Sequence, residues 1–176
     1  LFLFCFIVSC SKSSGDESQN GTSGEPFSMP IVEHVVIIGV DGMGGLFVGG
    51  PETSTLDELI ATGAYSLTMQ NVLPTSSSTN WMSMLNGQGT DGHGVYSNSW
   101  SVGDSTPAPT LVKILREQKP DAVIGVFHDW GDFGRLVEDG VADVLDEPGD
   151  ENETAQAAID YFKLNTPALT FIHLDH

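Results

Sequence analysis

An apolar run from Val35 to Val40 constrains the fold of this chain more than any other stretch. The run is short and rich in β-branched residues, and it is followed directly by Asp41. A strand that is apolar on both faces is typical of the centre of a parallel sheet covered by helices. Such a strand delivers the residue at its carboxyl end to the edge where open α/β folds bind ligands. Asp41 is therefore the first candidate site residue.

A hydroxyl-rich stretch, Thr75 to Ser78, precedes a segment with helical apolar spacing. Free backbone N–H groups and the helix dipole favour an anion at the start of a helix. An acid beside an anion-binding hydroxyl suggests that a metal ion lies between them. The first candidate pair is thus the carboxylate of Asp41 and a hydroxyl of this stretch.

From Pro30 onward, strand-like and helix-like segments alternate, which predicts an α/β fold with a largely parallel sheet and helices on both faces. With 176 residues and 40% apolar content, one domain with one sizeable core is expected. The strands are predicted at Val35–Val40, Ala64–Leu73, Ala122–Phe127, Val141–Leu145 and Ala168–Leu174. The helices are predicted at Ser54–Ala61, from near Ser78 to Gly87, and at Thr110–Arg116, Phe133–Glu138 and Glu151–Leu164.

Polar residues follow each predicted strand, and in a parallel sheet these ends share one edge. Polar residues also begin loops in general, so the pattern locates the edge better than it identifies individual ligands. The residues concerned are Asp41, Thr75 to Ser78, His128 and Asp129, Asp146 and Glu147, and Asp175 and His176.

The net charge of −18 argues against binding nucleic acid or anionic lipid through charge. The chain has no Gly-Lys-Ser/Thr, no His-Glu-x-x-His and no Gly-x-Ser-x-Gly. The sequence therefore does not support a P-loop nucleotide site, a zinc-protease site or the nucleophile elbow of an α/β hydrolase. A nucleophilic serine without a nearby general base would need a metal ion to lower the pKa of its hydroxyl.

The first ten residues form an apolar stretch too short to span a bilayer, and Ile7-Val8-Ser9-Cys10 resembles a bacterial lipobox. We therefore expect residues 1–10 to be a signal-peptide remnant, Cys10 to be lipidated, and residues 11–29 to be a flexible tether. An ordinary secretory signal that happens to contain Cys is the alternative. The lipid-anchor interpretation places the protein in a bacterial cell envelope, facing the periplasm or the surface.

An ordered set of motifs resembles the alkaline phosphatase superfamily, and within it the type I phosphodiesterase/nucleotide pyrophosphatase branch. These motifs are Val35 to Gly42, Pro74-Thr75-x-Ser77-x-x-Asn80, Leu85-Asn86-Gly87 and His93-Gly94-Val95. The resemblance implies that residues 30–176 are the N-terminal part of a hydrolase domain with an incomplete alkaline-phosphatase-like core. It also implies that further metal ligands follow His176.

Carried over by position, the resemblance makes Asp41 a metal ligand and Ser77 both the nucleophile and a metal contact. It makes Asn80 a ligand of a phosphoryl oxygen and Asp175 a third candidate metal ligand. The branch commonly has Thr as the nucleophile and Pro before the Asn, where this chain has Ser77 and Thr79. The neighbouring hydroxyls leave the register open by one residue.

Other polar residues receive no catalytic role from the resemblance. His93 matches a Gly-flanked position that is not a metal ligand, and His128 is interpreted as a hydrogen-bonded histidine at a strand end. Asp129 has no counterpart that would assign it a role. His93 and His128 are therefore expected to be structural, and Asp129 is left without an assigned role.

The resemblance implies a hydrolase that uses two divalent metal ions, zinc in particular, to cleave a small-molecule phosphate ester. The substrate class is a phosphodiester or a phosphomonoester, and Ser77 would carry the phosphoryl group between two displacements. Because the expected ligand set is incomplete, the 176-residue chain alone is expected to bind metal poorly and to be inactive. The alternative is a non-catalytic envelope lipoprotein that binds a carbohydrate or a phosphorylated ligand.

Overall fold

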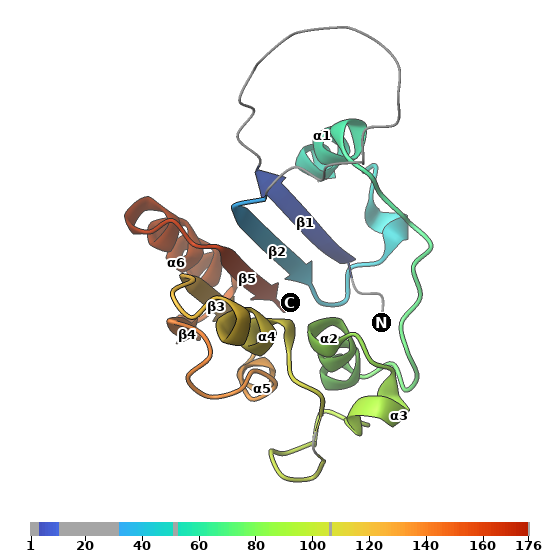
Figure 1. Cartoon of the computed structure of the whole chain (residues 1–176). Coiled ribbons are helices and arrows are strands. Elements are labelled where there is room, and N and C mark those ends of the chain that lie inside the picture. Colours follow the sequence, from blue (N-terminus) through green and yellow to red (C-terminus); the bar gives the residue numbers. More distant parts are fainter. Residues whose placement is uncertain (1–3, 11–31, 51–52, 106, 176) are drawn as a thin grey trace, which may run out of the picture.

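The computed structural model describes residues 4–10, 32–50, 53–105 and 107–175, and it has an α/β architecture built on one sheet (Figure 1). The strand order is β1-β2-β5-β3-β4. The strands are β1 (Phe4–Cys10), β2 (His34–Val40), β3 (Ile124–His128), β4 (Val144–Asp146) and β5 (Leu169–Leu174). The four strands from β2 to β4 in this order are parallel, and β1 pairs antiparallel with β2 at one edge. The predicted, largely parallel sheet is therefore confirmed.

Six α-helices and one short 3-10 helix are present among the described residues. They are η1 (Gly45–Phe47), α1 (Ser54–Thr62), α2 (Ser77–Asn86), α3 (Thr90–His93), α4 (Leu111–Gln118), α5 (Gly131–Gly134) and α6 (Glu151–Leu164). None of the helices in this described part is long and apolar enough to cross a membrane.

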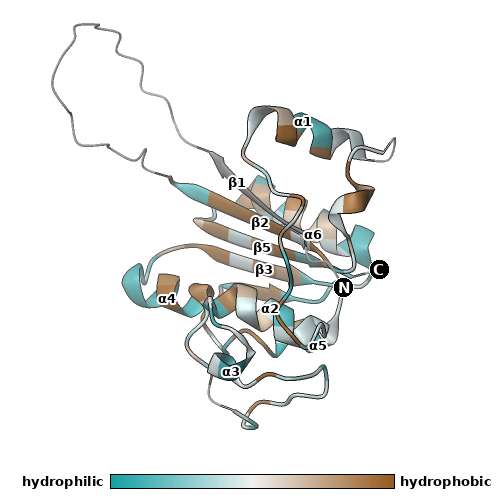
Figure 2. Cartoon of the chain, turned by 90° about the vertical axis from the view of Figure 1, so that its right-hand side faces the viewer, coloured by the Kyte–Doolittle hydropathy of each residue, from teal (hydrophilic) through white to brown (hydrophobic). Residues whose placement is uncertain are grey.

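Helices cover both faces of the sheet, as predicted, with α6 on one side and α2 on the other (Figure 2). Side chains of β2 alternate between two apolar clusters, one on each face. Val35 and Ile37 join the larger cluster, which also contains Trp81 of α2. Val36 and Ile38 join the smaller cluster, which contains Ala158 of α6. A strand that is buried on both faces must be apolar throughout, which explains the unbroken run in the sequence.

Local signals fix the ends of the two helices that matter most for the sheet edge. Asp150 caps α6, and a capping box with Glu153 closes its first turn. The helix α2 ends at Asn86 and is capped by Gly87, whose φ of 71° is a conformation that glycine adopts at little cost. The predicted bounds of α6 match the observed ones, and the prediction for α2 is correct to within one residue.

Two predicted elements differ from the structure. The segment Ala64–Leu73 is not a strand, because no neighbouring strand lies beside it and residues 61–70 are all exposed. The helix predicted at Phe133–Glu138 is only the short α5, which ends at Gly134. Its apolar spacing instead reflects turn residues, Leu136 and Val137, that are buried in the core.

The N-terminal predictions fall mostly outside the described residues. The predicted tether, residues 11–29, lies there entirely. Of the predicted leader, residues 4–10 form β1, which places Cys10 opposite His34. Because the pairing is antiparallel, Cys10 lies at the amino end of β2, and Phe4 lies opposite Val40 near Asp41.

Candidate active site

The carboxyl ends of the parallel strands gather polar residues at one edge, as predicted. The register pairs His128 with His173 and Val40 with Leu174, and the backbone N–H of Asp41 donates to the carbonyl of Leu174 at 2.7 Å. Asp41, Asp129 and Asp175 therefore follow neighbouring strands. The hydroxyl stretch before α2 reaches this edge by an irregular segment and not by a strand.

Asp41 is held against the sheet by the indole of Trp81. The carboxylate is only 6% exposed, and its Oδ2 accepts a hydrogen bond from Trp81 Nε1 at 3.1 Å. Gly39 makes this contact possible, because a Cβ at that position would lie 2.3 Å from Cη2 of the indole. Asp41 Oδ1 is buried and has no hydrogen-bond partner among the described residues. One oxygen of the carboxylate is thus fixed, and the other is left for a ligand.

Ser77 is the first residue of α2, and Ser76 is its N-cap. The Ser77 hydroxyl is partly buried, and none of the hydrogen bonds within the described residues involves it. The hydroxyl of the neighbouring Ser78 is buried and also has no partner among these residues. Ser77 lies one turn before Trp81 on the same helix face, since side chains four residues apart stack on a helix. The Trp81 contact therefore turns this helix face, with Ser77, toward the edge that carries Asp41.

The Asn80 amide is fully occupied by the chain segment that leads into α2. Its Oδ1 accepts from the backbone N–H of Val72 at 2.8 Å. Its Nδ2 donates to the carbonyls of Val72, Pro74 and Ser76 at 3.1 to 3.4 Å. The side chain is buried, so these bonds fix the approach to Ser77. The phosphoryl-binding role of Asn80 stays a prediction, and it competes with this use of the amide.

A second amide, Asn98, lies at the start of α2, and the sequence analysis did not single it out. Asn98 Oδ1 accepts a hydrogen bond from the backbone N–H of Ser78 at 2.9 Å. Its Nδ2 has no partner among the described residues. This amide caps the helix beside Ser77 from a loop twenty residues further along the chain. Only the fold brings the two together, and no local signal in the sequence predicts it.

A buried acid–imidazole pair lies behind the ends of β3 and β5. Asp129 Oδ1 accepts from the backbone N–H of Asp175 at 2.7 Å and faces His173 Nδ1 at 3.3 Å. Burial lowers the pKa of His173 to about 4, against the opposing effect of Asp41, and burial raises the pKa of Asp129. The imidazole is therefore neutral at pH 7, with Nδ1–H directed at the carboxylate and an unpaired lone pair on Nε2.

The other two buried histidines serve the structure of the chain. His128 Nδ1 donates to the carbonyl of Trp130 at 3.0 Å, and burial lowers its pKa. His93 Nδ1 accepts from the backbone N–H of Val95, and its Nε2 lies 2.9 Å from the Ser83 hydroxyl. Burial also lowers the pKa of His93. Both rings have local hydrogen-bond partners.

A sequence profile of the type I phosphodiesterase / nucleotide pyrophosphatase family matches residues 35–156, which is more than half of the chain. The chain belongs to this family. No curated protein and no solved structure matches it significantly. Membership indicates a hydrolase of phosphate esters, with an alkaline-phosphatase-like fold and typical dependence on metal ions. Asp41, Ser77, Asn80 and Asn98 lie inside the matched region, and Asp175 lies beyond it.

The chemistry of the edge fits a metal ion of the kind this family uses. Several buried polar atoms lack partners among the described residues, and three of them belong to acids or imidazoles near the strand ends: Asp41 Oδ1, Asp129 Oδ2 and His173 Nε2. A buried carboxylate oxygen without a partner is costly unless a cation or a donor meets it. The described residues nevertheless contain no group of three or more His, Cys, Asp or Glu side chains arranged to hold a metal. Asp41 therefore fits as one ligand of a set that these residues do not complete.

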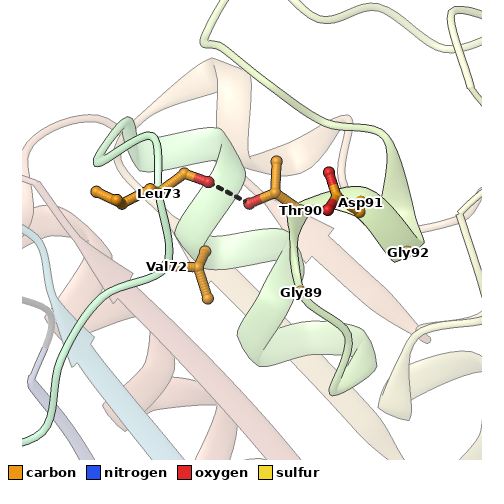
Figure 3. Close-up of a pocket in the computed structure, with 6 residues that line it drawn as sticks. All are labelled: Val72, Leu73, Gly89, Thr90, Asp91 and Gly92. Carbon is orange, nitrogen blue, oxygen red and sulfur yellow. Dashed lines mark hydrogen bonds between the residues drawn. The ribbon is translucent and has the colours of Figure 1, made fainter.

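An open hollow elsewhere on the molecule contains none of the predicted site residues (Figure 3). It lies between Val72 and Leu73 on one side and the start of α3 on the other. The Thr90 hydroxyl donates to the carbonyl of Leu73 at 2.6 Å across it. The hollow has the acid Asp91 but no cation and no free nucleophile pair. The candidate active site is therefore the sheet edge and not this hollow.

Proposed function

We propose that this chain carries the nucleophile segment of a metal-dependent phosphate-ester hydrolase, a phosphodiesterase or phosphatase that acts through a phosphoryl-Ser77. The observation that supports the proposal most directly is the link from Ser77 through Trp81 to Asp41. Ser77 lies four residues before Trp81 on α2, and Trp81 Nε1 donates to Asp41 Oδ2, whose partner oxygen Oδ1 is buried without a hydrogen bond among the described residues. The helical spacing supports a position of Ser77 on the side of α2 that faces Asp41.

Asp41 and Ser77 would hold a divalent metal ion, and Asp175 is a candidate third ligand from the neighbouring strand. When bound, a cation such as zinc shields the charge of the phosphoryl group and lowers the pKa of the attacking hydroxyl. The orphaned Oδ1 of Asp41 supports this role, because the surrounding protein supplies no donor to it.

In the proposed reaction, Ser77 Oγ attacks phosphorus, the bond from phosphorus to the leaving oxygen breaks, and the serine becomes phosphorylated. Water then attacks the phosphoserine, which releases the product and restores the hydroxyl. Charge that develops on the phosphoryl oxygens is stabilised by preorganised donors. The backbone N–H groups at the start of α2 and Asn98 Nδ2 are available for this purpose. Asn98 suits the role better than Asn80, whose amide donors are already used.

The experiment that tests the proposal uses the protein expressed from its complete gene, with zinc and two chromogenic probes. The probes are 4-nitrophenyl phosphate and bis(4-nitrophenyl) phosphate. Ser77→Ala is expected to reduce kcat by at least about 1,000-fold, because a nucleophile is lost. Acid quenching followed by peptide mass spectrometry is expected to find the phosphoryl group on Ser77. Ser54→Ala, in the exposed helix α1, serves as the control for serine replacement.

Two outcomes would contradict the proposal. If Ser76→Ala or Ser78→Ala carries the loss instead of Ser77→Ala, the nucleophile is misassigned. If neither probe is hydrolysed and Ser77→Ala binds inorganic phosphate as well as the unchanged protein does, the chain is the non-catalytic binding lipoprotein.

We further propose that Cys10 anchors the protein to a bacterial membrane through lipid. The lipobox-like sequence Ile7-Val8-Ser9-Cys10 supports this proposal, and cleavage before Cys10 would remove residues 4–9 of β1 and make Cys10 the lipidated first residue. Metabolic labelling with radioactive palmitate tests this. Label that disappears in Cys10→Ala is expected, whereas equal label in both proteins would contradict it.

A further inference from the structure

A single cation, Arg135, ties together the segments that surround the start of α2. Arg135 directly follows α5, and its side chain is 27% exposed. Its Nη2 donates to the main-chain carbonyl of Asn98, and the same atom pairs with Asp132 Oδ2 at 3.1 Å. Among the described lysines and arginines, only Arg135 hydrogen-bonds to the loop that carries Asn98. The contact joins parts of the chain 37 residues apart.

Asn98 is consequently held at two points. Arg135 holds its main-chain carbonyl, and the backbone N–H of Ser78 holds its side-chain Oδ1. Because a carboxamide is planar, fixing Oδ1 also fixes the direction of Nδ2. The Nδ2 donors are left for a ligand beside Ser77.

The other hydrogen bonds of the loop around Asn98 are between nearby residues; for example, Tyr96 Oη donates to Asp91 Oδ1, and the backbone N–H of Trp100 donates to the carbonyl of Ser97. Residues 96–99 are all exposed, and the nearest buried side chain is Trp100, whose Nε1 donates to Ser105 Oγ at 2.9 Å. An exposed loop of this kind moves readily unless a tertiary hydrogen bond restrains it. A hydrogen bond from a charged guanidinium is stronger than one between neutral groups.

From these contacts we propose that Arg135 is a positioning residue, which holds Asn98 so that Nδ2 meets an oxygen of the phosphoryl group at Ser77. The inference rests on the proposed function for its catalytic meaning. The inference adds Arg135, which lies outside the family motifs, to the candidate active site. Arg135 acts indirectly, because it holds Asn98 and Asn98 in turn holds the start of α2.

The test uses the complete gene product and four variants: Arg135→Ala, Asn98→Ala, the double variant, and Lys163→Ala. Lys163 is an exposed cation of α6, so its replacement removes the same charge at a remote place. The measurements are kcat and KM for 4-nitrophenyl phosphate, the Kd of inorganic phosphate, and the NMR shift of the Ser78 amide proton. The last two measurements need no turnover.

Arg135→Ala is expected to lower kcat about tenfold and to weaken phosphate binding by a similar factor, since one charge-assisted hydrogen bond is lost. The double variant is expected to be no worse than Asn98→Ala alone, because Arg135 acts through Asn98. The Ser78 amide proton is expected to shift in the same direction in both single variants. Lys163→Ala should change none of these quantities.

The proposal is overturned if the two single effects multiply in the double variant, or if Arg135→Ala leaves phosphate binding and the Ser78 shift unchanged. If Arg135→Ala does not fold, Arg135→Lys replaces it, because lysine keeps the charge and the apolar stem but not the planar fork. A loss of phosphate affinity of at least about threefold is then expected, and no loss would overturn the inference. A failure of the proposed function can be distinguished from a failure of this inference, because it would appear as full turnover in Ser77→Ala.

Discussion

The two halves of the candidate active edge are held in opposite ways. In the helix half, formed by α2 with Asn80 and Asn98, the buried amide of Asn80 makes four hydrogen bonds and Asn98 caps the helix. In the strand half, formed by Asp41, Asp129 and His173, each side chain leaves one buried polar atom without a partner among the described residues. In the helix half the amide that sets the entry to α2 is fully bonded, although Ser78 Oγ and Asn86 Nδ2 of the same helix are buried without partners among the described residues. In the strand half the unpaired atoms belong to the carboxylates and the imidazole themselves.

The difference shows which half depends on a ligand for its stability. Buried polar groups with partners stabilise a fold and set one geometry, whereas buried groups without partners cost free energy until something binds. The helix half therefore fixes where Ser77 lies before any ligand arrives. The strand half is expected to gain stability when a cation binds. Substitutions in the two halves should consequently have different effects on the free energy of unfolding.

The largest expected effect is in the helix half. Asn80→Ala removes an amide that binds three carbonyls and one N–H around the entry to α2. Leaving these backbone groups unpaired should lower the free energy of unfolding by about 3 kcal/mol. Urea denaturation of the 176-residue chain measures this, with Asn152→Ala in the exposed first turn of α6 as the control. A change as small as that of the control would show that the amide is not a structural element.

The next effect concerns the contact that joins the two halves. In Gly39→Ala, the new methyl group would lie 2.3 Å from Cη2 of Trp81, so the indole must move away from Asp41. Overpacking of this kind should cost about 2 kcal/mol. Thermal unfolding followed by Trp fluorescence measures it, and Gly50→Ala, whose nearest atom would be 3.7 Å away, is the control. Equal stability of the two variants would show that Trp81 does not pack tightly on β2.

The elements that the sequence predicts best are those whose signals are local. The apolar spacing predicts the helix Glu151–Leu164, Asp150 caps it directly before its first residue, and Glu153 completes the capping box from its first turn. The strand predicted at Val35–Val40 is observed at His34–Val40, and its run is apolar because its side chains pack into clusters on both faces of the sheet. In each case the pattern and the environment agree within one segment.

Predictions fail where the deciding partner is distant in the sequence. The alternating pattern at Ala64–Leu73 is typical of a strand, but strand formation needs a neighbour, and no neighbouring strand pairs with it. Asn98 and Arg135 sit in segments without regular patterning and acquire their roles only through contacts 20 and 37 residues away. For the site, the sequence indicated Asp41 and Ser77 as candidates, but it could not show which amide lies beside Ser77.

The third prediction concerns His173 in the strand half. Its pKa is lowered to about 4 in the folded chain and is ordinary, about 6.5, in the unfolded chain. Between these values the unfolded chain binds the proton and the folded chain does not, so stability falls as the pH falls from 6.5 toward 4. The contribution of His173 to this slope is at most about 1.4 kcal/mol per pH unit. Urea denaturation in EDTA at several pH values, compared with His173→Gln, measures it. An identical slope in the variant would show that the ring is not buried in its neutral form.

The smallest expected effect also separates the two halves most directly. Because Asp41 Oδ1 has no partner among the described residues, Asp41→Asn should change the metal-free free energy of unfolding by no more than about 1 kcal/mol. Zinc should stabilise the unchanged 176-residue chain by only about 1 kcal/mol at five times its Kd, and it should not stabilise Asp41→Asn at the same concentration. Thermal unfolding with EDTA or zinc measures both quantities. A metal-free loss as large as that of Asn80→Ala would contradict the comparison, because the carboxylate would then be as structurally integrated as the helix half. Equal stabilisation of both proteins by zinc would instead show that the cation binds away from Asp41.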